Sequence, residues 1–235
     1  CLCQIEQQTM KPTFLYHLLT LALLLCGMVM PSLQAQPYKN PSLSPEERTA
    51  DLLQRMTLEE KIAQIRHIHS WNIFEEQELN KSKLQEFVGD LCWGFVEGFP
   101  LTGENCHRHM RHIQEYMLNH TRLGIPIFTV AEALHGSVHE GSTIYPQNIA
   151  LASTFNPELA YLRATEISKE LHYQGINQIL APCIDVVRDL RWGRIEESYG
   201  EDPYLNGIFA YKEAKGYLDN GISPMLKHYG AHGNP

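Results

Sequence analysis

The second half of the chain alternates short apolar runs with longer amphipathic stretches, and this alternation constrains the fold more than any other feature. Residues 125–130, 176–181 and 224–226 are almost wholly apolar, as expected for strands buried on both faces. Between them, residues 156–175 and 202–221 begin at an Asn-Pro or Asp-Pro pair and end at glycine, as helices often do. The pattern predicts an α/β fold with parallel strands covered by helices, either an open doubly wound sheet or a (β/α)8 barrel.

These two helices are expected to pack on the sheet through apolar stripes at helical spacing. The stripe of the first helix is Ala160, Ala164, Ile167 and Leu171. The stripe of the second helix is Tyr204, Ile208, Tyr211 and Leu218.

The first half of the chain contains further elements. Ser44 and Thr57 are predicted to cap two helices, and Thr57 opens a Thr-Leu-Glu-Glu capping box. Residues 91–96 are interpreted as a buried strand and residues 104–120 as a helix. Residues 36–44, rich in proline and serine, are interpreted as a linker.

The composition, 43% hydrophobic and 20% charged residues, is that of a soluble globular protein. The formal net charge of -8 argues against a nucleic-acid partner, because no basic surface dominates. The strands are not followed by the Gly-x-Gly-x-x-Gly pattern of dinucleotide-binding enzymes, and no cofactor is predicted.

The N-terminal segment has the pattern of a secretory signal peptide at residues 10–35, with a basic start, an apolar core and small residues before a cleavage site. We therefore divide the chain into residues 1–35, which are upstream residues plus the signal peptide, and residues 36–235. The protein is predicted to be secreted or periplasmic, with no stable membrane span after cleavage. A membrane anchor is the alternative, because the apolar run is near the lower limit for spanning.

The cysteines after residue 35 and a histidine-rich stretch provide little evidence about the function. Cys92 and Cys106 are a candidate disulfide pair, although at least one buried free thiol is expected in this part of the chain. Helical spacing places His109 and His112 on one face and His107 away from it, so no metal site is assigned. A metal-dependent hydrolase that uses these histidines is the weakest of the functional hypotheses.

Polar side chains follow three successive predicted strands. Glu132 and His135 follow the first strand, residues 185–194 follow the second, and Lys227 and His228 follow the third. Because parallel strands present their carboxyl ends at one edge of a sheet or one rim of a barrel, these groups are predicted to meet in one site.

The combination of a carboxylate, arginine, lysine and histidine, with Trp192 and Tyr229 nearby, favours a sugar ligand. Charged groups form strong hydrogen bonds with vicinal hydroxyls, and aromatic faces pack on sugar C–H surfaces. A phosphate site gains nothing from Glu132, and a metal site requires more carboxylate or histidine ligands. No serine or cysteine nucleophile motif accompanies His228.

Several motifs follow one another in a specific order. They are Leu-Gly-Ile-Pro at 123–126, Glu-Ala-Leu-His-Gly at 132–136, Arg-Asp-Leu-Arg-Trp-Gly-Arg at 188–194, Glu-Ser-Tyr-Gly-Glu-Asp-Pro at 197–203 and Lys-His at 227–228. Together they resemble the N-terminal barrel domain of glycoside hydrolase family 3, from about Ser44 to the last residue.

The resemblance implies an incomplete (β/α)8 TIM-like barrel, with parallel strands alternating with helices. It implies a retaining, exo-acting β-glycosidase that removes a sugar from the non-reducing end of an oligosaccharide or a polysaccharide-derived substrate. By the matched motifs, Glu132, Arg194, Lys227 and His228 are the substrate-binding residues.

Three positions of the matched motifs need separate interpretation. Glucosidases of the family usually carry aspartate where this chain has Glu132, and the longer side chain takes up space that a C6 hydroxymethyl group would fill. A pentose, β-D-xylose or α-L-arabinofuranose, is therefore favoured over glucose; the alternative is a β-glucosidase in which Glu132 reaches the same hydroxyl from a displaced backbone. Arg191 is expected to brace the loop through Asp185 or Asp189, and His135 to orient its loop.

No catalytic residue is assigned within the chain. A retaining glycosidase needs a nucleophile and an acid/base carboxyl, and the resemblance implies that the nucleophilic aspartate and the acid/base glutamate lie beyond Pro235. About five of eight βα units are present, so we predict a truncated fragment that is itself inactive. A non-catalytic, carbohydrate-binding half-barrel is the alternative from another functional class.

Overall fold

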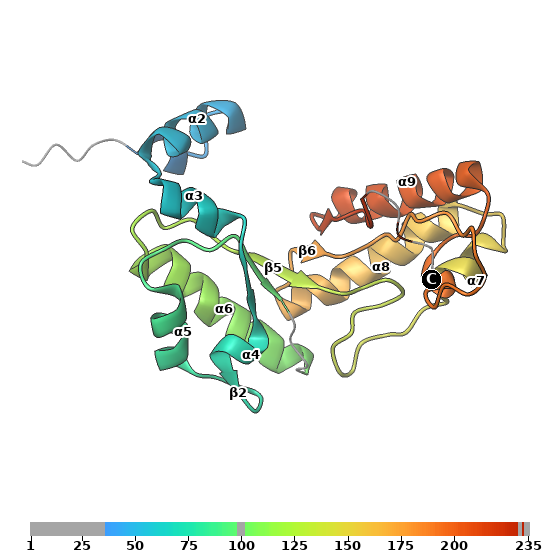
Figure 1. Cartoon of the computed structure of the whole chain (residues 1–235), viewed down its shortest axis with the longest axis horizontal. Coiled ribbons are helices and arrows are strands. Elements are labelled where there is room, and N and C mark those ends of the chain that lie inside the picture. Colours follow the sequence, from blue (N-terminus) through green and yellow to red (C-terminus); the bar gives the residue numbers. More distant parts are fainter. Residues whose placement is uncertain (1–35, 98–101, 230–231, 233–235) are drawn as a thin grey trace, which may run out of the picture. The chain divides into compact units, whose positions relative to one another are not determined.

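The computed structural model describes residues 36–97, 102–229 and 232 (Figure 1). The predicted signal peptide, residues 10–35, lies outside the described residues. The chain divides into two compact units, one ending at Met56 and the other beginning at Thr57. None of the helices among the described residues combines the length and the apolar character needed to cross a membrane.

The first unit contains a short 3-10 helix, Pro37–Lys39, and helix α2, Pro45–Arg55. Ser44 caps α2, and its side chain accepts a hydrogen bond from the Glu47 backbone N–H. The segment interpreted as a linker is more ordered than expected. Tyr38 is buried, its backbone N–H donates to Asp51 of α2 at 3.1 Å, and its carbonyl accepts from Arg48.

The second unit is built on a five-stranded parallel sheet in the order β1-β4-β5-β6-β7. The strands are β1 (His67–His69), β4 (Phe95–Glu97), β5 (Phe128–Ala131), β6 (Gln178–Ile179) and β7 (Ser223–Pro224). Each strand pairs with the next parallel strand of the chain, and the order never reverses. A doubly wound sheet reverses its order at a switch point, so this topology is that of an incomplete barrel, as predicted.

Helices separate the strands. They are α3 (Leu58–Gln64), α4 (Ser70–Ile73), α5 (Lys81–Val88), α6 (Gly103–His120), α7 (Asn148–Ala152), α8 (Glu158–Gln174) and α9 (Pro203–Asp219). A small antiparallel hairpin of β2 (Phe74–Glu75) and β3 (Glu78–Leu79) precedes α5, and a 3-10 turn, Ile195–Glu197, precedes α9. Helices α8 and α9 pack side by side (Figure 1).

The core lies between the sheet and the longer helices. Ile68, Val96 and Ile179 of the strands are fully buried and join one cluster with Ile113 of α6 and Ile167 of α8. Burying such a side chain contributes about 1.5–3 kcal/mol. The amphipathic helices are therefore held mainly by their contact with the sheet.

Helix α8 agrees with the sequence pattern. Its four predicted core residues are fully buried, and Gly175 ends the helix with φ of 76°. A β-carbon at that position would lie 3.2 Å from Cβ of Met110, so both the left-handed backbone and the close contact with α6 favour glycine.

Helix α9 begins and ends where predicted, but the prediction of its buried face was wrong. Tyr204, Tyr211 and Leu218 are exposed. The buried side is made of Asn206, Phe209, Ala210, Glu213, Gly216 and Tyr217. This face contains polar residues and a glycine because it forms a buried ion pair and a close helix contact with α8, and an apolar stripe does not describe such a face.

The strands are shorter than the apolar runs that predicted them. Pro182 has no N–H to give to a ladder, so regular pairing in β6 stops before it. Backbone contacts resume as an isolated bridge between Cys183 and Lys227. Residues 91–94, expected to be part of a strand, precede β4, and the carbonyl of Cys92 accepts a hydrogen bond from the Gln64 side chain at 2.6 Å.

The cysteines are not paired as considered above. Cys92, Cys106 and Cys183 are all free and buried. The Cys92 thiol contacts Thr121, whereas that of Cys106 contacts His139 at 3.2 Å. Burial raises the pKa of Cys106 to about 12, so this thiol is protonated and unreactive at neutral pH.

Candidate functional site

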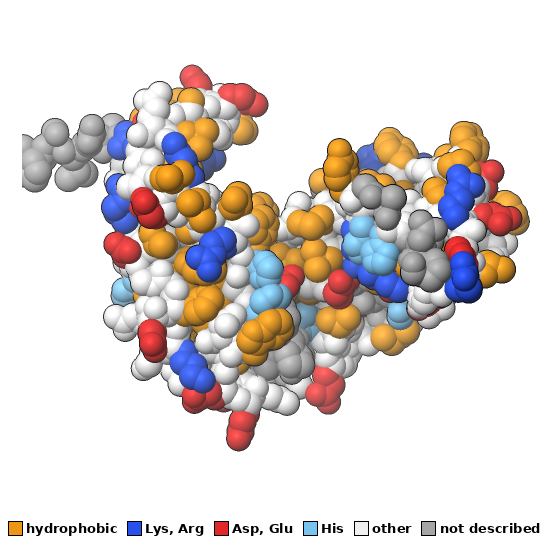
Figure 2. Space-filling model, viewed as in Figure 1, with side chains coloured by type: hydrophobic (Ala, Val, Ile, Leu, Met, Phe, Trp, Pro, Cys, Tyr) orange, Lys and Arg blue, Asp and Glu red, His pale blue; other side chains and the backbone are white. Residues whose placement is uncertain are grey.

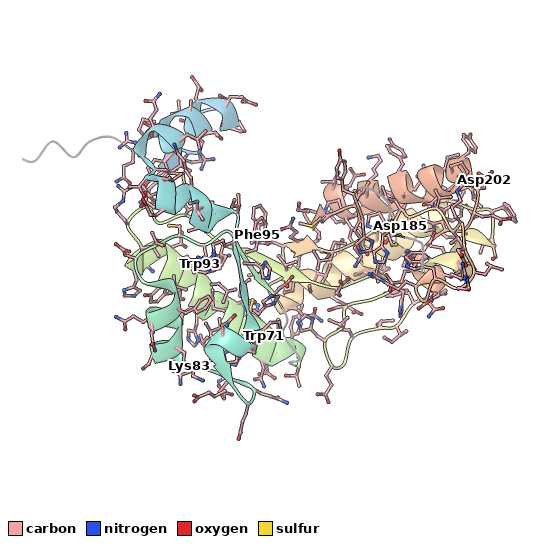
Figure 3. All side chains as sticks on the ribbon, viewed as in Figure 1. Trp71, Lys83, Trp93, Phe95, Asp185 and Asp202 are labelled. Carbon is pink, nitrogen blue, oxygen red and sulfur yellow. The ribbon has the colours of Figure 1, made fainter. Side chains whose placement is uncertain are left out.

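The carboxyl ends of β5, β6 and β7 bring the predicted site residues together. Glu132 follows β5 directly, and Lys227 and His228 follow β7. The backbone joins the segments after β6 and β7, since the Lys227 N–H donates to the Pro182 carbonyl at 3.0 Å and the Ile184 N–H to the Lys227 carbonyl at 2.7 Å. Figure 3 labels Asp185 within this cluster of side chains.

Lys227 and Glu132 form an ion pair across the strand ends. The ammonium Nζ lies 2.9 and 2.8 Å from the two carboxylate oxygens. The Lys227 side chain is 11% exposed and that of Glu132 is 42% exposed. The carboxylate therefore keeps one open side, where its remaining lone pairs can accept hydrogen bonds from a ligand.

Arg194 and His228 contact each other, and each also binds a carboxylate: Arg194 binds Glu197 and His228 binds Asp185. Nε and Nη2 of Arg194 donate to the two oxygens of Glu197, with Nε at 2.7 Å. Nη1 of Arg194 lies 3.3 Å from Nε2 of His228, and Nδ1 of His228 lies 2.7 Å from Asp185. Because arginine is only a donor, Nε2 of His228 accepts, and Nδ1–H donates to the Asp185 carboxylate.

Asp185 is fixed as an ionised group. Burial by itself raises its pKa, but hydrogen bonds from His228 and Cys183 outweigh burial and lower the pKa below its ordinary value. A carboxylate of this kind cannot serve as a proton donor near neutral pH. Its position supports a structural role, in which it fixes the tautomer of His228.

Arg191 and His135 are the two residues that were expected to position loops. Arg191 braces the loop through Asp189, one of the two partners considered, because its Nε and Nη2 both donate to that carboxylate. His135 lines the cavity described below, and its carbonyl accepts from the Tyr145 N–H at 2.7 Å. The Nδ1 atom of His135 is buried without a hydrogen-bond partner in the described part of the chain.

A cavity of about 330 Å³ opens beside these groups. It is lined by Glu132, Leu134, His135, Gly136, Ser137, Val138, Ile144, Arg194 and Glu197. This volume is at the lower end of ligand pockets, which span about 300–1,000 Å³, and suits a ligand of a single small ring. Of the four predicted site residues, Glu132 and Arg194 line this cavity, whereas Lys227 and His228 are not among its lining residues.

Of the two aromatic residues considered for the site, the prediction for Trp192 was wrong. Trp192 is buried against Cys183 and Val187 and belongs to a small apolar cluster. It cannot offer a face to a sugar, because the loop uses this side chain as its own core. Tyr229 is fully exposed.

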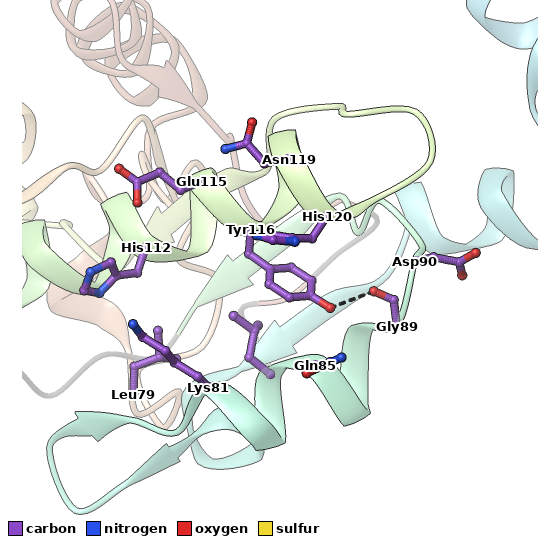
Figure 4. A pocket seen from close by; sticks show the side chains of 11 residues that line it. Leu79, Lys81, Gln85, Gly89, Asp90, His112, Glu115, Tyr116, Asn119 and His120 are labelled. Carbon is purple, nitrogen blue, oxygen red and sulfur yellow. Dashed lines mark hydrogen bonds between the residues drawn. The ribbon is translucent and has the colours of Figure 1, made fainter.

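A larger cavity, about 790 Å³, lies between α5 and α6, away from the strand ends (Figure 4). There Tyr116 donates to the Gly89 carbonyl at 2.9 Å, and the lining residues come from the two helices, the loop after α5 and Leu79 of β3. None of the four predicted site residues borders it.

The sequence did not reveal how Arg194 is positioned. Glu197 binds Arg194 through its carboxylate, and its carbonyl accepts from Asn148 of α7 at 2.6 Å. The Asn148 side-chain oxygen in turn accepts from Arg163 of α8 at 2.5 Å. One feature of the sequence could have indicated this network. Arg163 lies next to the apolar stripe of its helix, and a buried arginine requires a polar partner.

Comparison with known proteins identifies the family. Residues 57–235 match the model of the glycosyl hydrolase family 3 N-terminal domain. The chain belongs to glycosyl hydrolase family 3. A protein of Formosa agariphila that bears a provisional β-xylosidase name is 34% identical over 85% of this chain and 28% of its own length. A periplasmic β-glucosidase of Salmonella typhimurium is 32% identical over 87% of this chain and 26% of its own length.

Solved structures of family relatives share the fold. A β-glucosidase from Erythrobacter marinus superposes with a TM-score of 0.75 at 29% identity, over 85% of this chain and 27% of that one. A β-glucosidase from Listeria innocua gives a TM-score of 0.67 at 31% identity, over 81% of this chain and 27% of that one. The chain thus spans about a quarter of the length of the relatives that it matches.

Proposed function

We propose that the chain forms the sugar-binding rim of a retaining, exo-acting β-glycosidase whose catalytic carboxyls lie outside this sequence. The observation that carries the proposal is that Glu132 and Arg194 line one small cavity and that Lys227 is paired with Glu132. The family membership, with relatives named β-xylosidase and β-glucosidase, supports a glycosidic bond as the target.

The charges suit neighbouring hydroxyl groups. The open side of the Glu132 carboxylate accepts from two vicinal hydroxyls, as a bidentate acceptor does. Lys227 Nζ has three N–H groups, and its partners in the described part of the chain are the two Glu132 oxygens, which leaves a donor for a sugar oxygen. Arg194, which Glu197 holds, supplies donors from the other side of the cavity. His228, the fourth proposed substrate-binding residue, contacts the Arg194 guanidinium at 3.3 Å.

β-D-Xylose is the preferred substrate sugar in this proposal. The glutamate at position 132 is one methylene longer than the family's glucosidase aspartate, and the extra length occupies space next to the ring carbon that bears C6 in glucose. A methylene of this kind discriminates between substrates by about 1–3 kcal/mol. The family members named as xylosidases support the preference.

β-Glucosidase activity is the second candidate, favoured by the names of the periplasmic relative and of both compared structures. The two candidates separate when the full-length product of the encoding gene is assayed with aryl β-D-xyloside and aryl β-D-glucoside. A larger kcat/KM on the xyloside is expected. Faster glucoside cleavage would select the second candidate, and turnover of neither would refute a β-glycosidase of these two types.

The role of Glu132 has its own test. Glu132→Asp removes the extra methylene and should shift the ratio of xyloside to glucoside kcat/KM toward the glucoside by about 10- to 200-fold. An unchanged ratio would mean that Glu132 does not determine the sugar.

The role of Lys227 is tested by Lys227→Met in the same full-length product. A hydrogen bond from a charged group is worth about 1.5–3 kcal/mol, so kcat/KM should fall about 10- to 100-fold. The matched control is Lys215→Met, which removes a lysine of an exposed ion pair on α9 and should leave kcat/KM unchanged. Equal kcat/KM values for the two variants would show that Lys227 does not bind the substrate.

The 235-residue chain by itself should bind sugar weakly and hydrolyse nothing. The carboxylates that line its cavity, Glu132 and Glu197, are paired with Lys227 and Arg194, so we assign neither of them as nucleophile or acid/base. Turnover of an aryl xyloside by the chain at the rate of the full-length product would contradict this division of roles.

The proposal includes export of the protein through the predicted signal peptide, residues 10–35. A secreted or periplasmic product, cleaved after Ala35, should have an N-terminal sequence that begins at Gln36. A mature protein that retains residues 10–35 would instead support a membrane anchor.

A further inference from the structure

Three side chains of the kinds that bind transition metals meet on the neighbouring strands β1 and β4. His67 and His69 are separated by one residue in β1, and because side chains alternate along a strand, both lie on the face opposite the buried Ile68. The parallel register places Glu97 of β4 beside His69. These residues are outside the group that we propose for sugar binding.

The ligand atoms of the three residues converge. Nε2 of His67 lies 2.5 Å from Nε2 of His69 and 3.5 Å from Oε1 of Glu97, and Nδ1 of His69 lies 3.1 Å from the same oxygen. One ligand atom from each residue falls within 4.8 Å of the others. Two neutral imidazole nitrogens that face each other repel through their lone pairs unless a proton or a cation lies between them.

The surrounding aromatic contacts hold the imidazoles in place. The Trp71 ring stacks on His69, with centroids 3.9 Å apart and planes 12° from parallel, and His67 meets His69 edge-on at 4.1 Å. Figure 3 labels Trp71, and Figure 2 shows histidine side chains gathered at the surface of this part of the molecule. The cluster is partly exposed, so an ion can enter from solvent.

We propose that His67, His69 and Glu97 form a binding site for a divalent transition-metal ion, with Zn²⁺ as the ion that fits best. Two histidines and one glutamate are a known zinc donor set, which leaves a fourth tetrahedral position for water. Nitrogen and oxygen atoms about 2.1 Å from tetrahedral zinc lie about 3.4 Å apart, so the Nε2 atoms of His67 and His69, which are 2.5 Å apart, must separate by roughly 0.9 Å. A single ion takes only one nitrogen of His69. With Nε2 as that nitrogen, the 3.5 Å between Nε2 of His67 and Oε1 of Glu97 already has nearly the required length. The other nitrogen of His69, Nδ1, then carries a hydrogen and faces Glu97 at 3.1 Å, as the free nitrogen of a zinc-bound histidine commonly faces a carboxylate.

A proton is the competing occupant of this position. A histidinium shared between His67 and His69 and paired with Glu97 would satisfy the same three groups without metal. The two alternatives differ in their response to added zinc, because only the metal site binds Zn²⁺ with a stoichiometry of one.

The test is calorimetric titration of the untagged 235-residue chain with ZnCl₂ at pH 7.5. We expect one ion per chain, and His69→Ala and Glu97→Gln should each weaken that binding more than tenfold. His112→Ala, in α6, is the matched control and should bind as the unchanged chain does. The circular dichroism of each variant shows whether it is folded.

A second measurement uses the exposed Trp71. Cu²⁺ bound beside His69 should quench its fluorescence, and the quenching should be lost in Trp71→Phe, which retains the buried Trp93 and Trp192. Absence of stoichiometric zinc binding, or zinc binding that His69→Ala leaves unchanged, would overturn the proposal. In the first case a shared proton would explain the cluster.

Discussion

Replacing Arg163 with methionine should destabilise the second unit strongly. Arg163 of α8 and Glu213 of α9 form an ion pair at 2.5 Å, with side chains 3% and 0% exposed. Breaking a buried pair by removing one partner costs about 3–5 kcal/mol, because the other charge remains buried. Arg163 also donates to the Pro146 carbonyl and to Asn148, so Arg163→Met should lie near the upper end of this range.

The pH dependence of the variant provides a more specific signature. Burial raises the pKa of Glu213 above its ordinary value, whereas Arg163 acts in the opposite direction. Without Arg163 the pKa rises further, and the folded variant binds a proton that the unfolded chain releases above about pH 4.3. An acid with a raised folded-state pKa contributes stability at low pH that is lost as the pH rises through that value. The variant should therefore lose more stability at pH 8 than at pH 5.5.

Urea unfolding followed by circular dichroism at both pH values measures these free energies. The double variant Arg163→Met, Glu213→Met should recover much of the loss, since an apolar replacement of a whole buried pair is often nearly neutral. Lys169→Met removes a lysine of the exposed pair with Glu166 and should change stability by less than about 0.5 kcal/mol. The reasoning fails if Arg163→Met is as mild as Lys169→Met or if its loss is the same at both pH values.

Two further predictions follow from the hydrogen bonds. Glu197→Gln removes the carboxylate that holds Arg194, and kcat/KM of the full-length product on its preferred aryl glycoside should fall about 10-fold or more; an unaffected kcat/KM would show that Arg194 needs no such partner. Burial lowers the pKa of His139, which lies between Cys106 and Ser137, so the folded state resists a proton that the unfolded chain takes up below about pH 6.5. Stability should fall from pH 7.5 to 5.5, and the urea midpoint should fall less in His139→Asn; equal falls would contradict this assignment.

Local signals predicted the helix boundaries well. Both predicted caps form, because the side chains of Ser44 and Thr57 each accept from the backbone N–H three residues ahead; the Thr57 capping box is present as predicted, and Ser44 forms one as well. Gly175 ends α8 because the left-handed backbone there favours a residue without a β-carbon. Such features depend on neighbours in sequence, so the sequence contains nearly all the information about them.

The buried face of α9 could not be predicted from the sequence of that helix alone. Gly216 sits where a β-carbon would lie 2.7 Å from the Tyr161 carbonyl oxygen, and Glu213 is buried only because Arg163 faces it. Neither fact follows from the periodicity of α9, since each requires the position of α8. The exposed Tyr204 and Tyr211 produced the stronger apolar pattern on the opposite side.

The candidate site was predicted from the positions of its groups at strand ends, and the pairing among those groups required coordinates. Glu132 and Lys227 are 95 residues apart in the chain, yet their charged atoms lie within 2.9 Å. The opposite error affected Trp192, which was counted with the ligands although the loop buries it. His67 and His69 were missed because a three-residue strand gives too short a pattern to recognise.

The position of Arg194 depends on residues deep in the helix layer. Arg163 donates to Asn148, Asn148 donates to the Glu197 carbonyl, and the Glu197 carboxylate receives Arg194. The same arginine that neutralises Glu213 therefore also helps to fix a group at the rim of the sheet. A polar core at this place costs stability compared with an apolar one, but an apolar core has no directional bonds with which to orient the loop. The buried charges between α8 and α9 therefore orient Arg194, which lines the cavity, as well as joining the two helices.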